Sequence, residues 1–248
     1  MALPFFYTPV YDPAAPELTL DEDNSRHIIQ VLRMRPGEAL QLTDGKGVLL
    51  TATIVDDHKK KCRVSIRSAE TQPRRSPTVT IAISPLKNAS RFEWFLEKAT
   101  EIGVSAIIPL ICERTERQVT RHDRLQHILI SAMLQSQQSW LPAFPEPQSF
   151  SLLVSGAMPA EAVPTTEFRL IAHCLEAPRA TMTLADVVRG GATTTGTLIL
   201  IGPEGDFSPR EVETALAAGY LPVSLGANRL RTETAGIVAA TLDRKSVV

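Results

Sequence analysis

The sequence predicts an α/β fold with a largely parallel sheet, preceded by a smaller β-rich domain. Short alternating stretches between turn signals fill the first ~70 residues, which is typical of antiparallel β-structure. From residue 78 onward, short apolar runs alternate with stretches of helical periodicity, as in parallel α/β sheets. Residues 71–77, TQPRRSP, contain two prolines and no apolar residue. We therefore expect one domain over residues 1–72 and a second over 73–248.

The first domain has three candidate strands and one candidate helix. The strands are expected at Ala39–Leu42, Gly47–Ile54 and Cys62–Ile66, where apolar and polar residues alternate. Between the first two strands, Asp44-Gly45 predicts a tight hairpin, because glycine readily adopts the positive φ that such turns require. A short helix is expected over Asn24–Arg33.

The second domain is predicted to alternate five strands with four helices. The expected strands are Val79–Ile83, Ala106–Leu110, Phe168–Leu175, Thr197–Ile201 and Pro222–Leu225. The first expected helix begins near Ser90, with the spacing of a capping box, and ends at Gly103. The second runs from Thr120 to Gln138. The third opens at Ser208-Pro209-Arg210-Glu211, and the fourth covers Thr232–Leu242. The third helix has Ser208 as its cap, Pro209 in its first turn, and Glu211 where its side chain can bond back to the cap.

The composition excludes several classes of protein. The net charge of −1 argues against binding nucleic acid by bulk electrostatics, so any RNA contact must use local patches. The three cysteines lie far apart without CxxC spacing, which indicates reduced thiols in a cytoplasmic protein and predicts neither a metal site nor disulfides. No apolar run reaches the roughly 18 residues of a membrane helix, and the start lacks the pattern of a secretory signal.

Three loops follow predicted strands, and the carboxyl ends of parallel strands are where open sheets place ligand sites. The loops comprise residues 173–176, 202–207 and 225–235. Glycines at 202, 205 and 226 would let backbone groups approach a ligand closely. GPEGDF at 202–207 has neither the GxGxxG nor the GK[ST] pattern, and its carboxylates would repel phosphate, which disfavours a nucleotide-dependent enzyme.

The last two loops lie within residues 201–242, IGPEGDFSPREVETALAAGYLPVSLGANRLRTETAGIVAATL. This segment resembles the C-terminal signature of the RsmE family, SPOUT-class methyltransferases that modify small-subunit (16S) ribosomal RNA. The resemblance continues upstream in matching order through Glu97–Val104, Gln135-Ser136, His27–Arg33 and Asp44–Gly47. It therefore covers nearly the whole chain.

The sequence departs from the family pattern at three places. Asp206 stands where the family commonly has the second glycine of GPEGGF, and aspartate tolerates positive φ better than most residues. Gln138 stands where an arginine is usual, and the usual arginine near the N-terminus is absent. The latter two departures bear on RNA contacts.

The resemblance implies a SPOUT-type α/β domain with a C-terminal trefoil knot, behind an N-terminal PUA-like β-barrel that docks RNA. It also implies a homodimer formed through the knot region and S-adenosylmethionine as cofactor, with no metal. The residues expected around the cofactor belong to the three strand-end loops and the start of the last helix. They are Leu175, Gly202, Gly205, Leu225, Gly226, Leu230, Thr232, Thr234 and Ala235.

The implied reaction is methylation of N3 of one uridine in the decoding region of 16S ribosomal RNA. Arg231 is expected to stabilise negative charge that develops on the uracil carbonyls. Glu204 or Glu233 would accept the N3 proton, or else orient a neighbouring arginine. Two alternatives are a SPOUT enzyme acting on another position, such as a ribose 2′-hydroxyl, and a non-catalytic RNA-binding or ribosome-assembly factor.

RNA docking is expected to use basic residues in both domains, through phosphate contacts. These are Arg26, Arg33, Arg35, Lys59, Lys60, Lys61, Arg63, Lys87 and Arg91. For the lysine run, a solvated hairpin tip is an equally good interpretation. His27 and His173 are interpreted as structural, because the sequence offers no partner for either.

Overall fold

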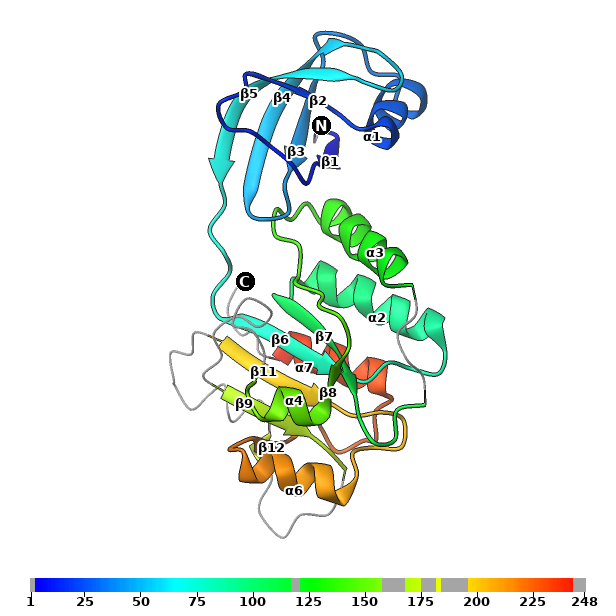
Figure 1. Cartoon of the computed structure of the whole chain (residues 1–248), viewed down its shortest axis with the longest axis vertical. Coiled ribbons are helices and arrows are strands. Elements are labelled where there is room, and N and C mark those ends of the chain that lie inside the picture. The colour runs from blue at the N-terminus through cyan, green and yellow to red at the C-terminus, as the bar shows by residue number, and fades with distance from the viewer. Residues whose placement is uncertain (1–2, 117–120, 158–167, 175–181, 184–195, 243–248) are drawn as a thin grey trace. The chain divides into compact units, whose positions relative to one another are not determined.

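The computed structural model describes residues 3–116, 121–157, 168–174, 182–183 and 196–242 (Figure 1). The chain forms two compact units. The first comprises Met1–Arg74 together with Met133–Leu141, and the second comprises Arg75–Ala132 together with Pro142–Val248. The return of 133–141 to the first unit was not indicated by the sequence, because nothing local distinguishes it from the preceding helix.

The first unit contains a five-stranded sheet in the order β1-β3-β4-β5-β2. The strands are β1 (Phe5–Tyr7), β2 (Glu17–Thr19), β3 (Ala39–Thr43), β4 (Val48–Asp56) and β5 (Arg63–Thr71). All pairs are antiparallel except β1 with β3. The predicted hairpin is confirmed, with positive φ at Gly45 and Gly47. β1 and β2 escaped prediction because three residues are too few to show alternation.

The predicted helix Asn24–Arg33 was wrong at both ends. The chain forms α1 (Glu22–Arg26), which continues into the π-helical turn η1 (His27–Val31). The helix starts earlier because the carboxylate of Asp21 accepts a hydrogen bond from the Asn24 amide at 2.8 Å and caps it. Arg33 lies beyond the helix with a φ of 56°. Ile28, fully buried, attaches this segment to the core of the sheet.

Trp140, in the returning segment, packs on the hairpin of the first unit. Its indole nitrogen donates to the Gln72 carbonyl at 3.0 Å, and the Arg74 guanidinium lies 5.2 Å from the ring centroid. The ring contacts the backbone of Gly47 so closely that a Cβ there would overlap it. Glycine at 47 is thus required both by its φ of 98° and by this contact.

The second unit is built on a seven-stranded sheet in the order β10-β12-β9-β11-β6-β7-β8, and each pair is parallel. The strands are β6 (Thr78–Ile83), β7 (Ala106–Ile111), β8 (Gln148–Ser149), β9 (Phe168–Ala172), β10 (Met182–Thr183), β11 (Gly196–Ile201) and β12 (Leu221–Ser224). The predicted parallel sheet is confirmed. β11 lies between β9 and β6, so strand order does not follow chain order. The ends of β9, β11 and β12 are therefore neighbours.

Helices cover both faces of this sheet (Figure 1). They are α2 (Ala89–Ile102), α4 (Phe150–Val154), α6 (Pro209–Ala217) and α7 (Thr232–Leu242), and a further helix, α3 (His122–Gln135), follows β7 in the chain. Leu198 and Leu200 of β11 share a core cluster with Phe150 of α4 and Val212 of α6. Ile199 and Ile201 point to the opposite face, where α7 packs on α2. Covering on both faces explains why β11 is buried throughout and mostly apolar.

Helix ends show where local patterns succeed and fail. The capping box at Ser208 is confirmed, with the Ser208 and Glu211 side chains bonding reciprocally to backbone amides. The capping box at Ser90 was wrong, because Asn88 caps α2 by accepting from the Ser90 amide at 3.0 Å. Gly103 ends α2 as predicted, with a φ of 88°. α3 stops at Gln135, short of the predicted end, because the chain turns with positive φ at Gln137.

Candidate active site

Two adjoining cavities open at the carboxyl ends of β9, β11 and β12 in the second unit. Their volumes are about 430 and 680 Å³, within the range of roughly 300–1,000 Å³ that is typical of small-molecule sites. Residues common to both cavities form the wall between them. They are Ala172, Cys174, Asp206, Arg229, Leu230 and Ala235. The sheet topology thus gathers loops from distant parts of the chain, as expected for strand ends.

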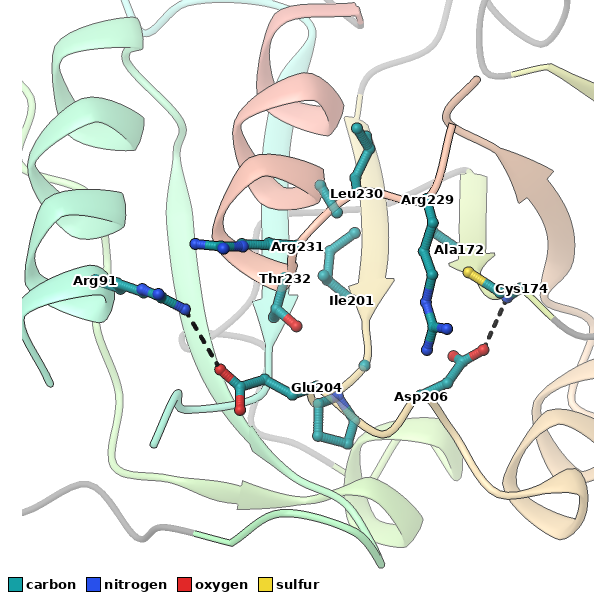
Figure 2. Close-up of a pocket in the computed structure, with 13 residues that line it drawn as sticks. Arg91, Ala172, Cys174, Ile201, Glu204, Asp206, Arg229, Leu230, Arg231 and Thr232 are labelled. Carbon is teal, nitrogen blue, oxygen red and sulfur yellow. Dashed lines mark hydrogen bonds and ion pairs between the residues drawn. The ribbon is translucent and has the colours of Figure 1, made fainter. Parts of the chain in front are cut away.

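The smaller cavity is lined by charged side chains from three elements (Figure 2). Arg91 comes from α2, Glu204 from the loop after β11, and Arg231 from the segment before α7. Arg91 lies 3.9 Å from Glu204 through Nη1 and 3.8 Å from Glu233 through Nε. The side chain of Glu233 is only 10% exposed, and its Oε2 has no hydrogen-bond partner among the described residues. With Asp206 and Arg229, which also line it, the cavity holds three guanidinium groups beside two carboxylates.

The larger cavity is lined mainly by backbone and small or apolar residues of the loop after β12. That part of its lining comprises Leu225, Gly226, Ala227 and Asn228. On the other side, Arg114 donates from Nη1 to the Gly205 carbonyl at 2.7 Å and so fixes the loop after β11. Gly226 has a φ of 133°, a conformation that other residues rarely adopt. Such a lining can recognise a neutral heterocycle or ribose by shape and by main-chain hydrogen bonds.

The loop 202–207 owes its shape to two local features. At Gly202, a Cβ would lie 3.0 Å from the ring of Phe207, so any side chain here would require the buried phenylalanine to shift by a few tenths of an ångström. Asp206 has a φ of 61°, which confirms that this position takes the left-handed conformation. Its Oδ1 accepts from the Phe207 amide and its Oδ2 from the Cys174 amide, each at 2.8 Å. The loops after β9 and β11 are thereby joined.

The described residues include no group of three or more histidine, cysteine, aspartate or glutamate side chains arranged to hold a metal ion. Within the same ranges, none of the helices has the length and apolar character needed to cross a membrane.

Comparison with protein families matches both units. Residues 73–242 match the RNA methyltransferase domain, and residues 20–67 match the RNA methyltransferase PUA domain. The ribosomal RNA small subunit methyltransferase E of Synechocystis is 30% identical over 224 residues, which cover 90% of this chain and 71% of that protein. The chain belongs to the RsmE family of RNA methyltransferases.

Solved structures agree with RsmE membership. A probable rRNA-methyltransferase from Porphyromonas gingivalis is 40% identical, with a TM-score of 0.83 and 96% of each chain covered. A putative methyltransferase from Legionella pneumophila, crystallised with S-adenosylmethionine, is 30% identical, with a TM-score of 0.81 and 98% of each chain covered. The predicted class, an α/β SPOUT-type domain with an N-terminal PUA-like domain, is confirmed.

The residues expected around the cofactor of this RsmE protein divide between the two cavities. Gly202 and Thr232 line the smaller cavity, Gly205, Leu225 and Gly226 line the larger, and Leu230 and Ala235 line both. Thr234 is exposed and lines neither. Leu175 lies outside the described residues. These assignments stay predictions about the cofactor.

Among the expected catalytic residues, Arg231 and Glu204 line the smaller cavity, whereas Glu233 lies behind Arg91 and lines neither cavity. Arg91 was expected to dock RNA, but the structure places it in the cavity itself. Arg229, which lines both cavities, was missed. Its position two residues before Arg231 was the available signal, but the sequence does not show which arginine of a loop faces inward.

The basic residues expected to dock RNA on the first unit are largely paired with carboxylates at the surface. Arg26 and Lys60 both reach Glu22, at 2.6 and 3.3 Å. Arg35 pairs with Asp57 at 3.5 Å, and Arg63 pairs with Glu17 and Asp56 at 3.4 and 3.3 Å. In the part of the chain that the structure describes, no ion pair involves Arg33, Lys59 or Lys61. In the second unit, Lys87 pairs with Glu116 at 2.9 Å.

We expect His173 to make the stability of the second unit depend on pH. Both ring nitrogens are buried without a hydrogen-bond partner among the described residues. Burial lowers the pKa of His173 below its ordinary value of 6.5, and the charge of Asp206 partly opposes this shift. In the window just below pH 6.5, the His173 imidazole therefore binds a proton in the unfolded chain but not in the folded chain. We expect the free energy of unfolding to decrease as the pH falls through this window.

Urea unfolding at about pH 7.5 and about pH 5.5 measures this effect. His173→Gln should reduce the pH dependence, whereas His127→Gln, a change at an exposed histidine on α3, should leave it unchanged. Equal pH dependence in the wild type and His173→Gln would contradict the assignment.

Proposed function

We propose that this RsmE protein uses S-adenosylmethionine to methylate N3 of a uridine in the decoding region of 16S ribosomal RNA. The observation that carries the proposal is the pair of adjoining cavities. One is lined mainly by the small and apolar residues of the loop after β12, which suit a nucleoside-like cofactor, and the other holds guanidinium and carboxylate groups. The relatives named as small-subunit ribosomal RNA methyltransferases, and the cofactor bound in the Legionella structure, support the same activity.

The residues of the larger cavity fit S-adenosylmethionine. Leu225, Gly226 and Leu230 would hold the cofactor, with backbone groups at the strand ends serving as hydrogen-bond partners. None of the loops has the pattern of a phosphate cradle, which agrees with a cofactor that carries no phosphate. Bound S-adenosylmethionine supplies a methyl group that its sulfonium centre already activates, so the protein's task is chiefly alignment.

The smaller cavity is suited to a uracil ring. A uracil offers two carbonyl oxygens as acceptors, and Arg91 and Arg231 supply guanidinium donors. Loss of the N3 proton spreads negative charge onto these carbonyls, and a fixed guanidinium stabilises that charge. Because N3 takes part in base pairing, the uridine must be unpaired or flipped out of a helix to enter.

We assign the two glutamates different roles. Glu204 lines the cavity with a side chain that is 46% exposed, so it can receive the N3 proton and release it to solvent. Glu233 is nearly buried and reaches the cavity only through Arg91. It acts as a positioning residue that orients Arg91. The sequence left these roles open.

The proposal extends to the rest of the molecule. The PUA-like unit would dock RNA, led by Arg33, Lys59 and Lys61, whose charges are not offset by an ion pair within the described ranges. The domain division at 72/73, the trefoil knot, the homodimer and the cytoplasmic location form part of the same proposal. The knot and the homodimer follow from the RsmE resemblance, the domain division from the composition of residues 71–77, and the cytoplasmic location from the isolated cysteines.

The test combines purified protein, methyl-labelled S-adenosylmethionine and small ribosomal subunits that lack the modification, followed by nucleoside mass analysis. We expect 3-methyluridine. A 2′-O-methylated nucleoside would instead support the ribose alternative. Absence of both transfer and cofactor binding would favour the non-catalytic RNA-binding alternative.

A further inference from the structure

Asp206 combines a positive φ with a carboxylate that accepts two backbone hydrogen bonds. Its φ of 61° is a conformation in which glycine is the least strained residue, and the RsmE pattern commonly has glycine there. Both carboxylate oxygens are nevertheless engaged, each with a backbone amide at 2.8 Å. The residue lines both cavities. An aspartate in this conformation, with both oxygens satisfied, indicates a function for the carboxylate itself.

We propose that Asp206 is a positioning residue that fixes the wall between the two cavities and thereby sets the affinity for S-adenosylmethionine. This inference rests on the proposed function, and it concerns binding of the cofactor and not the rate of transfer. The carboxylate joins the backbone of Cys174, in the loop after β9, to the loop before α6, where it also accepts from the Phe207 amide.

The hydrogen bond from the Cys174 amide to Asp206 holds a segment that lies beyond the hydrogen bonds of the sheet. The pairing of β9 with its neighbours ends at Ala172, which lies opposite Ile201 on one side and Val223 on the other. Cys174 lies two residues further along, where the chain has left the sheet, and its amide donates to Asp206. The bond therefore anchors the backbone of the wall just beyond the last sheet pairing.

Arg229 belongs to the same wall as Asp206. Figure 2 shows the Arg229 guanidinium directed toward the Asp206 carboxylate. Both residues line both cavities. A negative charge at Asp206 favours this orientation of Arg229.

Two substitutions distinguish the effect of the Asp206 carboxylate from the effect of its backbone conformation. Asp206→Gly removes both hydrogen bonds and relieves the positive φ, so the fold should persist. Asp206→Asn keeps the shape but leaves one acceptor oxygen for two amides. Amide hydrogen exchange at Cys174, measured by NMR without cofactor, should accelerate about tenfold in Asp206→Gly and less in Asp206→Asn.

Calorimetry should show that the dissociation constant for S-adenosylmethionine rises about tenfold in Asp206→Gly. The kcat of this variant at saturating cofactor should stay within about twofold of the wild-type value.

Asp12→Gly is the matched control. Asp12 is exposed in the first unit, and its Oδ1 accepts from the Ala14 amide at 2.9 Å. This variant loses the same charge and a bond of the same kind, and it should match the wild type in both measurements.

The outcomes distinguish this inference from the proposed function. If the wild type binds S-adenosylmethionine and Asp206→Gly binds it equally well with unchanged exchange at Cys174, the positioning role is overturned while the proposed function stands. A fall in kcat with unchanged affinity would also overturn it, because the carboxylate would then act on transfer. If the wild type itself fails to bind the cofactor, the proposed function is wrong and this inference falls with it.

Discussion

Replacing Arg231 by alanine should lower the rate of methyl transfer about 10²–10³-fold while leaving the dissociation constant for S-adenosylmethionine within about twofold of the wild type. Arg231 lines the smaller cavity beside Glu204 and Thr232 and does not line the larger one. Its guanidinium is therefore expected to act on charge that develops in the uracil ring, and not on the bound cofactor. Single-turnover kinetics with saturating RNA and cofactor measures transfer, and calorimetry measures binding.

Two further variants sharpen this prediction. Arg231→Lys keeps the charge but loses the planar pair of donors, so we expect an intermediate rate. Arg210→Ala, an equivalent change on the exposed first turn of α6, should transfer at the native rate. Native transfer by Arg231→Ala with normal binding of RNA and cofactor would refute the catalytic assignment.

Gly236→Ala should destabilise the protein by about 1–3 kcal/mol, although alanine normally favours a helix over glycine by about 1 kcal/mol. Gly236 lies within α7, where a Cβ would come within 2.5 Å of Phe95 Cε2 and 3.0 Å of Ile83 Cδ1. Both neighbours are fully buried, so neither can move out into solvent. Because Ala235 of the same helix lines both cavities, we also expect weaker cofactor binding. Urea unfolding measures the stability.

A double-mutant cycle identifies the cause. Phe95→Leu shortens the ring that a Cβ at residue 236 would meet, so the double variant should be more stable than the sum of the two single changes predicts. A Gly236→Ala variant as stable as the wild type would show that α7 does not pack against α2 this closely. If the effects of Gly236→Ala and Phe95→Leu on the free energy of unfolding are additive, the strain does not arise from the contact between these two residues.

Features that depend on neighbours along the chain could be predicted from the sequence. Asp44-Gly45 indicated the hairpin, since the turn is determined by a few consecutive dihedral angles. Ser208 and Glu211 indicated the start of α6, because a capping box closes within four residues. Apolar runs such as Thr197–Ile201 predicted strands covered on both faces. The same local reasoning failed at Ser90, where Asn88 was the better-placed cap.

The family resemblance and the strand-end rule together indicated the candidate site, but only the tertiary structure decided its composition. Arg91 and Arg231 are far apart in the sequence and line one cavity because α2 and the segment before α7 lie on the same side of the sheet. The bridge from Asp206 to Cys174 exists because β9 and β11 are neighbours. Such contacts depend on strand order and helix packing. A linear pattern of residue types specifies which segments form strands and helices, and long-range packing then determines which of their side chains meet.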